Sequence, residues 1–449
     1  RRTNWKNLSD GSLGAGGGGC MRYRSKSMVA LVAVLTLVGV ACGGGKKTPT
    51  PKATGPLAGT TITFSEFASP DETTAVKEVL KKFEDQTGVK VNLVNSIDAA
   101  TLPQKLQVEV SSGNHTIHLF GQDNLALATL VDQGLVEDLS DVQPPAGITP
   151  ALVPPKFNGK QYFLPYRANV RVTYVNKDRF DAAGVSPPQT TDEYKTVAEK
   201  LKAAAGGQGK VTLSLADTGG DAGPLGVTIS EWVVSFGGDP AILNDNGSVQ
   251  AFTFLQQLWK EGVFAKESKQ AKFDTERDYL RTETSWFATN WPFTTPFLST
   301  AGILSKFEVY AGWKGPVRAA HVIGGEVLGM PKGITGKQKD AALALAQFIM
   351  SQQAQQILVA KNGWASVRTD SNGQVPADQR QTWEAVNAAL KDGWFRPNVV
   401  YWIDIQNAMD DAVGRILYNG QDVKTALDDE HNKIEQAAKS KGATYPPTG

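Results

Sequence analysis

The chain has little cysteine, little histidine and no long apolar run, and each of these absences excludes a kind of site or a source of stability. Only two of its 449 residues are cysteine, so the stability of the fold must come from a buried core. Of four histidines, His115 and His118 sit at a loop-to-strand junction, where alternating side chains point to opposite faces, and we expect no metal site there. The main apolar run, Val29–Ala41, has 13 residues, whereas a membrane-spanning helix needs about 20.

An excess of charge of one sign is also missing. The 46 basic and 45 acidic residues give a formal net charge of +1, which argues against nucleic acid or a highly charged ligand as the main partner. The sequence has no Gly-x-Ser-x-Gly elbow, no phosphate loop and no dinucleotide fingerprint. A binding protein without a cofactor is expected to lack all three motifs. Paired carboxylates for glycoside cleavage stay open, because their separation is set only in three dimensions.

The N-terminal residues have the pattern of an export signal and a tether. After Met21 come three basic residues, the apolar run Val29–Ala41 and then Cys42, which is followed by a stretch rich in glycine, lysine and proline. A basic head, a short apolar stretch and a small residue predict an export signal that is cut. We expect residues 1–20 to be a non-native extension, 21–41 a signal peptide and 42–58 a flexible linker.

Cys42, at the expected cut, resembles the lipidated cysteine of a bacterial lipoprotein signal. Val40 and Ala41 fit that pattern, whereas Gly39 stands where the family prefers Leu, Val or Ile. The resemblance implies a protein anchored by lipid to the extracytoplasmic face of the cell membrane. An acylated Cys42 cannot pair, so the mature fold would have no disulfide and no thiol site. The alternative is an ordinary signal peptide with an incidental cysteine.

From Thr60 onward, strands and helices alternate. A buried strand at Thr60–Phe64, a helix that opens at Ser69–Glu72 and ends at Gly88, and a strand at Val89–Val94 predict a parallel βαβ unit. The pattern predicts further strands at Ile117–Phe120, Tyr162–Tyr166, Val170–Val175 and Val211–Leu215, and helices at Leu125–Val131, Asp192–Ala205, Val249–Lys260, Ala341–Ala360 and Tyr401–Leu417. The expected fold class is α/β with parallel-rich sheets.

A series of short motifs resembles, in order, the extracellular solute-binding proteins of sugar ABC transporters, of the maltose-binding-like kind. The motifs are residues 159–166, 174–178 and 184–193, Asn290–Pro292, Gly315–Pro316, Gly324–Gly325, Pro331–Lys332 and Gly363–Arg368, where Ser366 replaces the usual proline. The resemblance implies a two-lobed periplasmic-binding-protein-like fold of type II, with a hinge between the lobes. It places one lobe at 59–168 and 321–362, and the other at 169–320 and 363–449.

A sugar site needs aromatic planes for flat C–H faces and polar side chains for hydroxyls. By resemblance and by position after predicted strands, the ligand-binding candidates are Glu66, Phe120, Gln122, Asp123, Tyr166, Asn290, Trp291, Trp313, Gly325, Glu326, Trp364, Arg368 and Trp402. Three have structural alternatives: Trp291 as a hinge-packing aromatic, Trp402 as a core residue and Asp123 as a helix cap. Glu326 stands where many relatives carry an aromatic residue, and it could bind hydroxyls or a cationic group or pair with a basic residue.

The function that the resemblance implies is capture of a sugar or oligosaccharide between the lobes and its delivery, unchanged, to a membrane permease. We expect a monomer that binds no nucleic acid and touches the membrane only through its lipid anchor. Two alternatives stay open: a receptor for another polar solute, such as a polyol phosphate or a polyamine, and a secreted carbohydrate-active enzyme.

Overall fold

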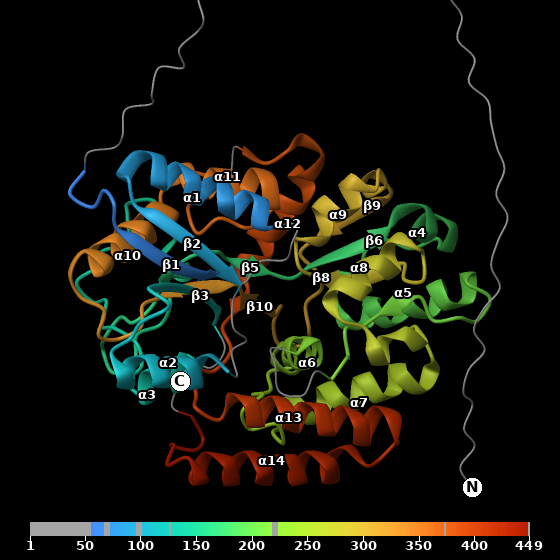
Figure 1. Cartoon of the computed structure of the whole chain (residues 1–449). Coiled ribbons are helices and arrows are strands. Elements are labelled where there is room, and N and C mark those ends of the chain that lie inside the picture. Colours follow the sequence, from blue (N-terminus) through green and yellow to red (C-terminus); the bar gives the residue numbers. More distant parts are fainter. Residues whose placement is uncertain are drawn as a thin grey trace, which may run out of the picture. The chain divides into compact units, whose positions relative to one another are not determined.

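The computed structural model describes residues 55–66, 72–95, 101–124, 127–217, 223–371 and 374–447. Cys42, the expected extension, the signal peptide and most of the linker lie outside these ranges. The described residues build three sheets with helices packed against them (Figure 1).

The first sheet has the strand order β2-β1-β3-β11-β4. Its strands are β1 (Thr61–Glu66), β2 (Lys90–Asn95), β3 (Leu119–Asp123), β11 (Glu326–Gly329) and β4 (Leu164–Pro165). β1 runs parallel to β2 and β3, while β11 runs antiparallel to β3 and β4. The predicted βαβ unit is confirmed: α1 (Thr73–Thr87) joins β1 to β2 and ends where Gly88 adopts a left-handed conformation.

The second sheet has the order β7-β8-β6-β9, and a third, short sheet has the order β12-β10-β5. The second comprises β6 (Val172–Asn176), β7 (Val211–Thr212), β8 (Phe287–Asn290) and β9 (Phe307–Tyr310); the third comprises β5 (Asn169–Val170), β10 (His321–Gly324) and β12 (Gly393–Trp394). Along the chain, β5 leads into β6 and β10 leads into β11. We call the third sheet the linking sheet, because its strands continue into both of the others.

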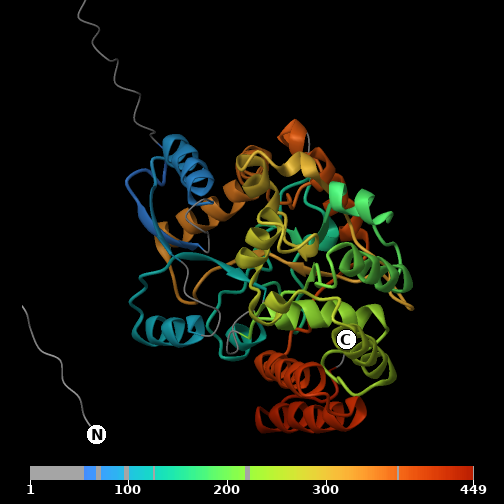
Figure 2. The ribbon, with the colours of Figure 1, turned by 90° about the vertical axis from the view of Figure 1, so that its right-hand side faces the viewer.

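The α-helices pack against these sheets and against one another. They are α2 (Leu102–Ser112), α3 (Leu127–Asp132), α4 (Lys177–Ala183), α5 (Thr191–Ala204), α6 (Pro224–Ser235), α7 (Asn246–Glu261), α8 (Phe273–Arg281), α9 (Thr294–Thr300), α10 (Gly336–Ile349), α11 (Gln352–Asn362), α12 (Arg380–Lys391), α13 (Trp402–Val413) and α14 (Val423–Ser440). Every residue of α6 is buried, as expected of a helix that is covered on all sides. α13 and α14 pack side by side (Figures 1 and 2).

Two large cores are each assembled from separate stretches of the chain. One takes its buried apolar residues from 62–166 and 328–364, under the first sheet. The other takes them from 175–287 and 401–438, around α6 and α13. A chain that leaves a core and returns to it must cross between the two more than once, and the linking sheet is where it crosses.

The structure corrects three expectations about elements. The single helix predicted at Ala341–Ala360 is two helices, α10 and α11, because Ser351 is extended and its Oγ caps α11 by accepting from the backbone N–H of Ala354. The strand predicted at Val211–Leu215 keeps its ladder only over Val211–Thr212. The sheets are mixed rather than parallel-rich, because β11 enters the first sheet antiparallel and β6 is antiparallel to both of its neighbours.

Gly325 forms the bend between β10 of the linking sheet and β11 of the first sheet. Its φ is +96°, a conformation that residues with a side chain rarely adopt. A Cβ at this position would also press into the carbonyl oxygen of Arg167. Both facts require glycine at the bend.

Gly325→Ala should therefore lower the free energy of unfolding by roughly 1–3 kcal/mol, measured by urea denaturation. Gly336→Ala is the matched control, because Gly336 also has a positive φ, +60°, but a Cβ there would meet nothing within 4 Å. Equal losses in the two variants would show that the close approach to Arg167 costs nothing.

Candidate functional site

A cavity lies where the linking sheet meets the end of the first sheet. It is partly open to solvent and narrow: the space in and around it amounts to about 460 Å³ when open solvent is included. Its wall is made of Asn124, Leu127, Leu152, Pro154, Pro155, Pro165, Tyr166, Arg167, Ala168, Ile323, Gly324, Glu326, Val327, Val367, Phe395, Arg396 and Asn398. Of the predicted ligand-binding residues, Tyr166 and Glu326 line this cavity.

Arg167 is the centre of a buried ionic cluster on the cavity wall. Its Nη2 donates to Oε1 of Glu326 at 2.7 Å, and its Nη1 donates to Oε1 of Glu72 at 3.2 Å. The guanidinium also lies 4.0 Å from the centre of the Trp364 ring, and the indole N–H of Trp364 donates to Glu72. Glu326 therefore pairs with an arginine, one of the roles left open for it. One face of Trp364 is covered by that arginine.

Glu66 ends β1 beside this cluster. The side chain is buried, and burial raises the pKa of its carboxyl to about 8, against the lowering effects of the Arg167 charge and the Tyr166 hydroxyl. At neutral pH the carboxyl is thus mostly protonated. The cluster then carries the two carboxylates of Glu72 and Glu326 against one guanidinium.

Arg396 is a second arginine on the cavity wall, and the sequence did not single it out. It follows β12, and its Nη2 donates to Oδ1 of Asp123 at 2.8 Å and to Oδ1 of Asn124. The amide of Asn124 in turn donates to the backbone oxygen of Ile323 in β10, at 2.9 Å. Asp123 is thereby brought to the edge of the cavity through Arg396. The only signal in the sequence was an arginine in the short Arg-Pro-Asn segment after Trp394.

A third arginine, Arg171, is fully buried beside the second sheet. Its Nη1 donates to Oε2 of Glu231 at 2.8 Å, and its Nη2 donates to the backbone oxygen of Thr289. The other oxygen of Glu231 accepts from the backbone N–H of Val322 in β10, at 3.1 Å. Arg171 and Glu231 thus join α6 to the linking sheet.

Asn290 and Trp291 hold the end of β8 rather than opening into the cavity. The amide of Asn290 donates to the backbone oxygen of Phe273 at 2.7 Å and accepts from the N–H of Trp291, also at 2.7 Å. The Trp291 ring is 8% exposed and packs edge-on against Phe273. It lies over Gly324, where any Cβ would collide with the ring. These contacts match the alternative of an aromatic packed at the hinge.

Of four other predicted residues, three are buried in a core or in a strand, and Trp313 is partly buried against a core. Phe120 packs over Gly329, and Trp402, 2% exposed, belongs to the core around α13. Trp313 packs against Tyr194 and Trp232, with ring centres 4.7 and 5.0 Å apart. Gln122 is buried within β3. The structure brings none of the four to the cavity.

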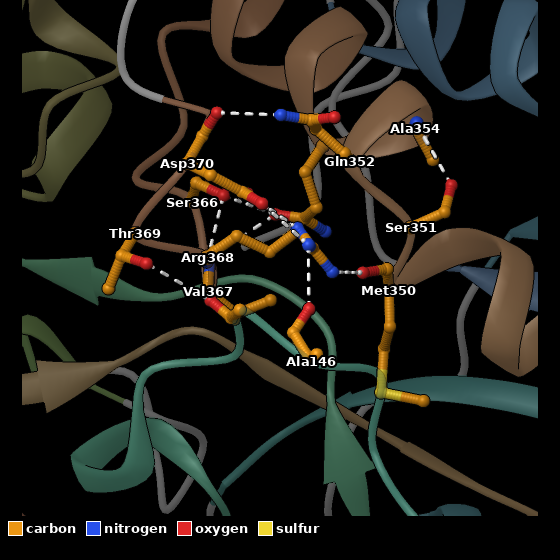
Figure 3. Close-up of polar contacts among 12 residues, drawn as sticks. Ala146, Met350, Ser351, Gln352, Ala354, Ser366, Val367, Arg368, Thr369 and Asp370 are labelled. Atoms are coloured by element: carbon orange, nitrogen blue, oxygen red, sulfur yellow. Dashed lines mark hydrogen bonds and ion pairs between the residues drawn. The ribbon is translucent and has the colours of Figure 1, made fainter.

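Arg368 acts as a clasp: the hydrogen bonds of its side chain join segments that are far apart in the sequence (Figure 3). Its Nε and Nη2 donate to the two carboxylate oxygens of Asp370, each at 2.7 Å. Nη1 donates to the backbone oxygen of Met350 at 3.1 Å, and Nη2 also donates to that of Ala146 at 2.7 Å. Every nitrogen of the guanidinium is therefore used within the protein, which leaves it poorly suited to contact a ligand.

The described residues contain no group of three or more His, Cys, Asp or Glu side chains that could hold a metal ion. Nδ1 of His118 instead accepts from the backbone N–H of Thr63 at 3.1 Å. Within the same described ranges, no helix has the length and apolar character needed to cross a membrane.

Arg368→Ala should lower the free energy of unfolding by about 3 kcal/mol, because the carbonyl oxygens of Met350 and Ala146 and the carboxylate of Asp370 lose charged donors. Urea denaturation measures the loss. Arg281→Ala removes an exposed pair with Asp278 and should cost less than about 1 kcal/mol. A loss for Arg368→Ala as small as that of the control would contradict the role of a clasp.

Glu276 should make the protein less stable as pH rises. The side chain is fully buried, and burial raises the pKa of its carboxyl from 4.5 to about 8. The nearby charge of Arg171 and the hydroxyl of Ser214 lower this pKa, whereas the charge of Glu231 raises it further. Folding therefore favours the protonated form. This contribution to stability is complete below pH 4.5 and is lost as pH rises toward 8.

Glu276→Gln should flatten this decline in melting temperature between pH 5 and 8, whereas the exposed change Glu384→Gln should leave it intact. Glu66 and Asp410, whose pKa values are also raised to about 8, will keep part of the slope. An unchanged slope in Glu276→Gln would show that Glu276 is ionised in the fold.

Known structures share this arrangement of elements. The maltose-bound MalE3 of T. maritima superposes with a TM-score of 0.73 at 20% identity, covering 84% of this chain and 99% of that one. UgpB of Mycobacterium tuberculosis, in complex with glycerophosphocholine, gives a TM-score of 0.69 at 18% identity, covering 85% and 99%. The predicted two-lobed α/β fold with a hinge between the lobes is thus confirmed.

Sequence comparison gives the family. A protein of Brucella abortus (strain 2308), named as a binding protein, is 36% identical over 137 residues; the match spans 29% of this chain and only 33% of that relative's length. The sequence profile described as bacterial extracellular solute-binding protein matches residues 78–388. Because that stretch covers well over half of the chain, the protein belongs to the family of bacterial extracellular solute-binding proteins.

Proposed function

We propose that the protein binds a sugar or oligosaccharide between its lobes and delivers it, unchanged, to the permease of an ABC importer. The observation that carries this proposal is the pair of arginine–carboxylate contacts at the cavity, Arg167–Glu326 and Arg396–Asp123, of which Arg167, Glu326 and Arg396 line the wall. The family acts outside the cytoplasm, which places such a receptor where an importer needs it.

The two pairs suit hydroxyl groups better than a charged ligand. A hydroxyl both donates and accepts a hydrogen bond, and a guanidinium beside a carboxylate offers a donor and an acceptor side by side. The Arg396–Asp123 pair is neutral as a whole, and the cluster of Arg167 with Glu72 and Glu326 carries one net negative charge, so the wall repels an anionic solute and offers a polycation only a single charge. Neither a polyol phosphate nor a polyamine is favoured by this arrangement.

The rest of the wall is apolar. Pro154, Pro155, Pro165 and Val327 line it, together with the aromatic ring of Phe395. Such surfaces fit the C–H faces of a sugar ring. In this proposal Phe395 stacks on the sugar ring, a role that the sequence had suggested for tryptophans. The maltose in the structure of MalE3 from T. maritima supports a sugar as the ligand of this fold.

The mechanism we propose is lobe closure. With lobes at 59–168 plus 321–362 and 169–320 plus 363–449, the cavity wall takes residues from both, and the bend at Gly325 lies near the start of the first lobe's second segment. A solute that contacts both lobes stabilises the closed form, which the permease then recognises. We further propose a monomer held at the membrane by a lipid on Cys42.

A thermal-shift screen against neutral sugars and oligosaccharides tests the proposal. A solute at 100 times its Kd should stabilise the fold by about 2.7 kcal/mol, and the recovered sugar should be unchanged. Glu326→Gln should reduce that shift, whereas Glu384→Gln on the exposed side of α12 should keep it. Release of shorter sugars would point to an enzyme, and no shift with any sugar would refute a sugar receptor.

A further inference from the structure

Arg396 occupies a position that is fixed by the linking sheet. Two residues earlier, Trp394 ends β12, which pairs in parallel with β10 through His321↔Gly393 and Val322↔Trp394. The Arg396 side chain is 3% exposed, yet it forms part of the cavity wall between Phe395 and Asn398. Burial of a permanently charged group is costly unless it is paired, so its partners explain where it lies.

Those partners belong to the opposite lobe. Asp123 and Asn124 follow β3 of the first sheet, whereas Arg396 comes from the return segment of the predicted second lobe. Asn124 is itself tied to Gly325, whose backbone oxygen accepts from its N–H at 3.3 Å. The contact between Arg396 and Asp123 therefore bridges the bend at Gly325.

Two of the three guanidinium nitrogens have no hydrogen-bond partner among the described residues. Nη2 serves Asp123 and Asn124, whereas Nε is fully enclosed and Nη1 makes no hydrogen bond within the described ranges. Because Arg396 lines the cavity and Nε is enclosed, Nη1 is the free nitrogen that an acceptor oxygen of a bound solute can reach.

We propose that Arg396 is a solute-contacting residue that also holds the second lobe's return segment against the first lobe. Resting on the proposed function, this assigns Nη1 to a solute oxygen and Nη2 to Asp123. Solute affinity and lobe position are then coupled through one side chain. A solute oxygen on Nη1 favours the arrangement in which Nη2 also reaches Asp123, so binding strengthens the contact between the lobes.

Distances between the lobes test the holding role without any solute. Spin labels at Val108→Cys, 69% exposed in α2, and Lys439→Cys, 67% exposed in α14, report the separation by pulsed electron resonance. The full chain carries Cys20→Ser and Cys42→Ser, so that only these labels remain.

Arg396→Ala should lengthen and broaden the measured distance distribution in the folded protein. Asp123→Asn, which removes the charge of the partner, should shift it in the same direction. Arg281→Ala, which removes an exposed pair far along the chain, should leave it unchanged. A distribution identical to that of the parent chain in both Arg396→Ala and Asp123→Asn would overturn the holding role.

Affinity tests the solute contact. For a sugar found in the thermal-shift screen, Arg396→Ala should raise Kd at least tenfold, and Arg396→Lys, which has one nitrogen in place of the guanidinium fork, should raise it almost as much. Arg396→Lys should nonetheless keep a distance distribution closer to the parent's, because it retains a charge for Asp123. An unchanged Kd in Arg396→Ala would overturn the solute contact.

The two proposals fail separately. If no sugar stabilises the parent chain, the proposed function fails, while the distance measurement still decides whether Arg396 joins the lobes. If a sugar binds and Arg396→Ala alters neither distance nor Kd, the receptor stands and the inference about Arg396 is wrong.

Discussion

Two buried arginines, Arg167 and Arg171, fix the chain where it crosses between its two cores. Arg167 is bound on one side of the crossing, to Glu72 and Glu326. Arg171 is bound on the other side, to Glu231 on α6. Only the short strand β5 and Ala168 separate them, so each end of the crossing is anchored to a different body of the molecule.

Ionic anchors of this kind are a poor way to gain stability, because two charges must be stripped of water before they attract each other. Their advantage is specificity. If one partner is displaced, an unpaired charge stays buried at a large cost in free energy, so wrong positions of the crossing strand are disfavoured. Glu231 extends the constraint to β10, through the N–H of Val322. Gly325 then gives the chain its one sharp bend before β11. A fixed crossing next to a bend is what hinge motion between two rigid bodies requires.

The cavity depends on the same arrangement. Arg167 and Glu326 face it from the crossing and from β11, and Arg396 reaches it from the segment after β12, which pairs with β10. The polar groups that line the cavity are therefore among the groups that join the crossing and the linking sheet to the first sheet. The aromatic residues with the strongest sequence signals are elsewhere: Trp291 packs over Gly324, and Trp402 lies in the core around α13.

The sequence by itself determined the α/β class, the βαβ unit from Thr61 to Asn95 and the order of motifs typical of the family, because these depend on local periodicity, turn residues and short spacings. Two of the residues that it predicts to bind a ligand, Tyr166 and Glu326, line the cavity. Only the tertiary structure decided that Arg368 is a clasp, that Glu326 meets Arg167 across 159 positions of sequence, and that Arg396 meets Asp123 across 273. Such pairings have no local signature, since an arginine looks the same in sequence whether it faces solvent, a carbonyl or a buried carboxylate.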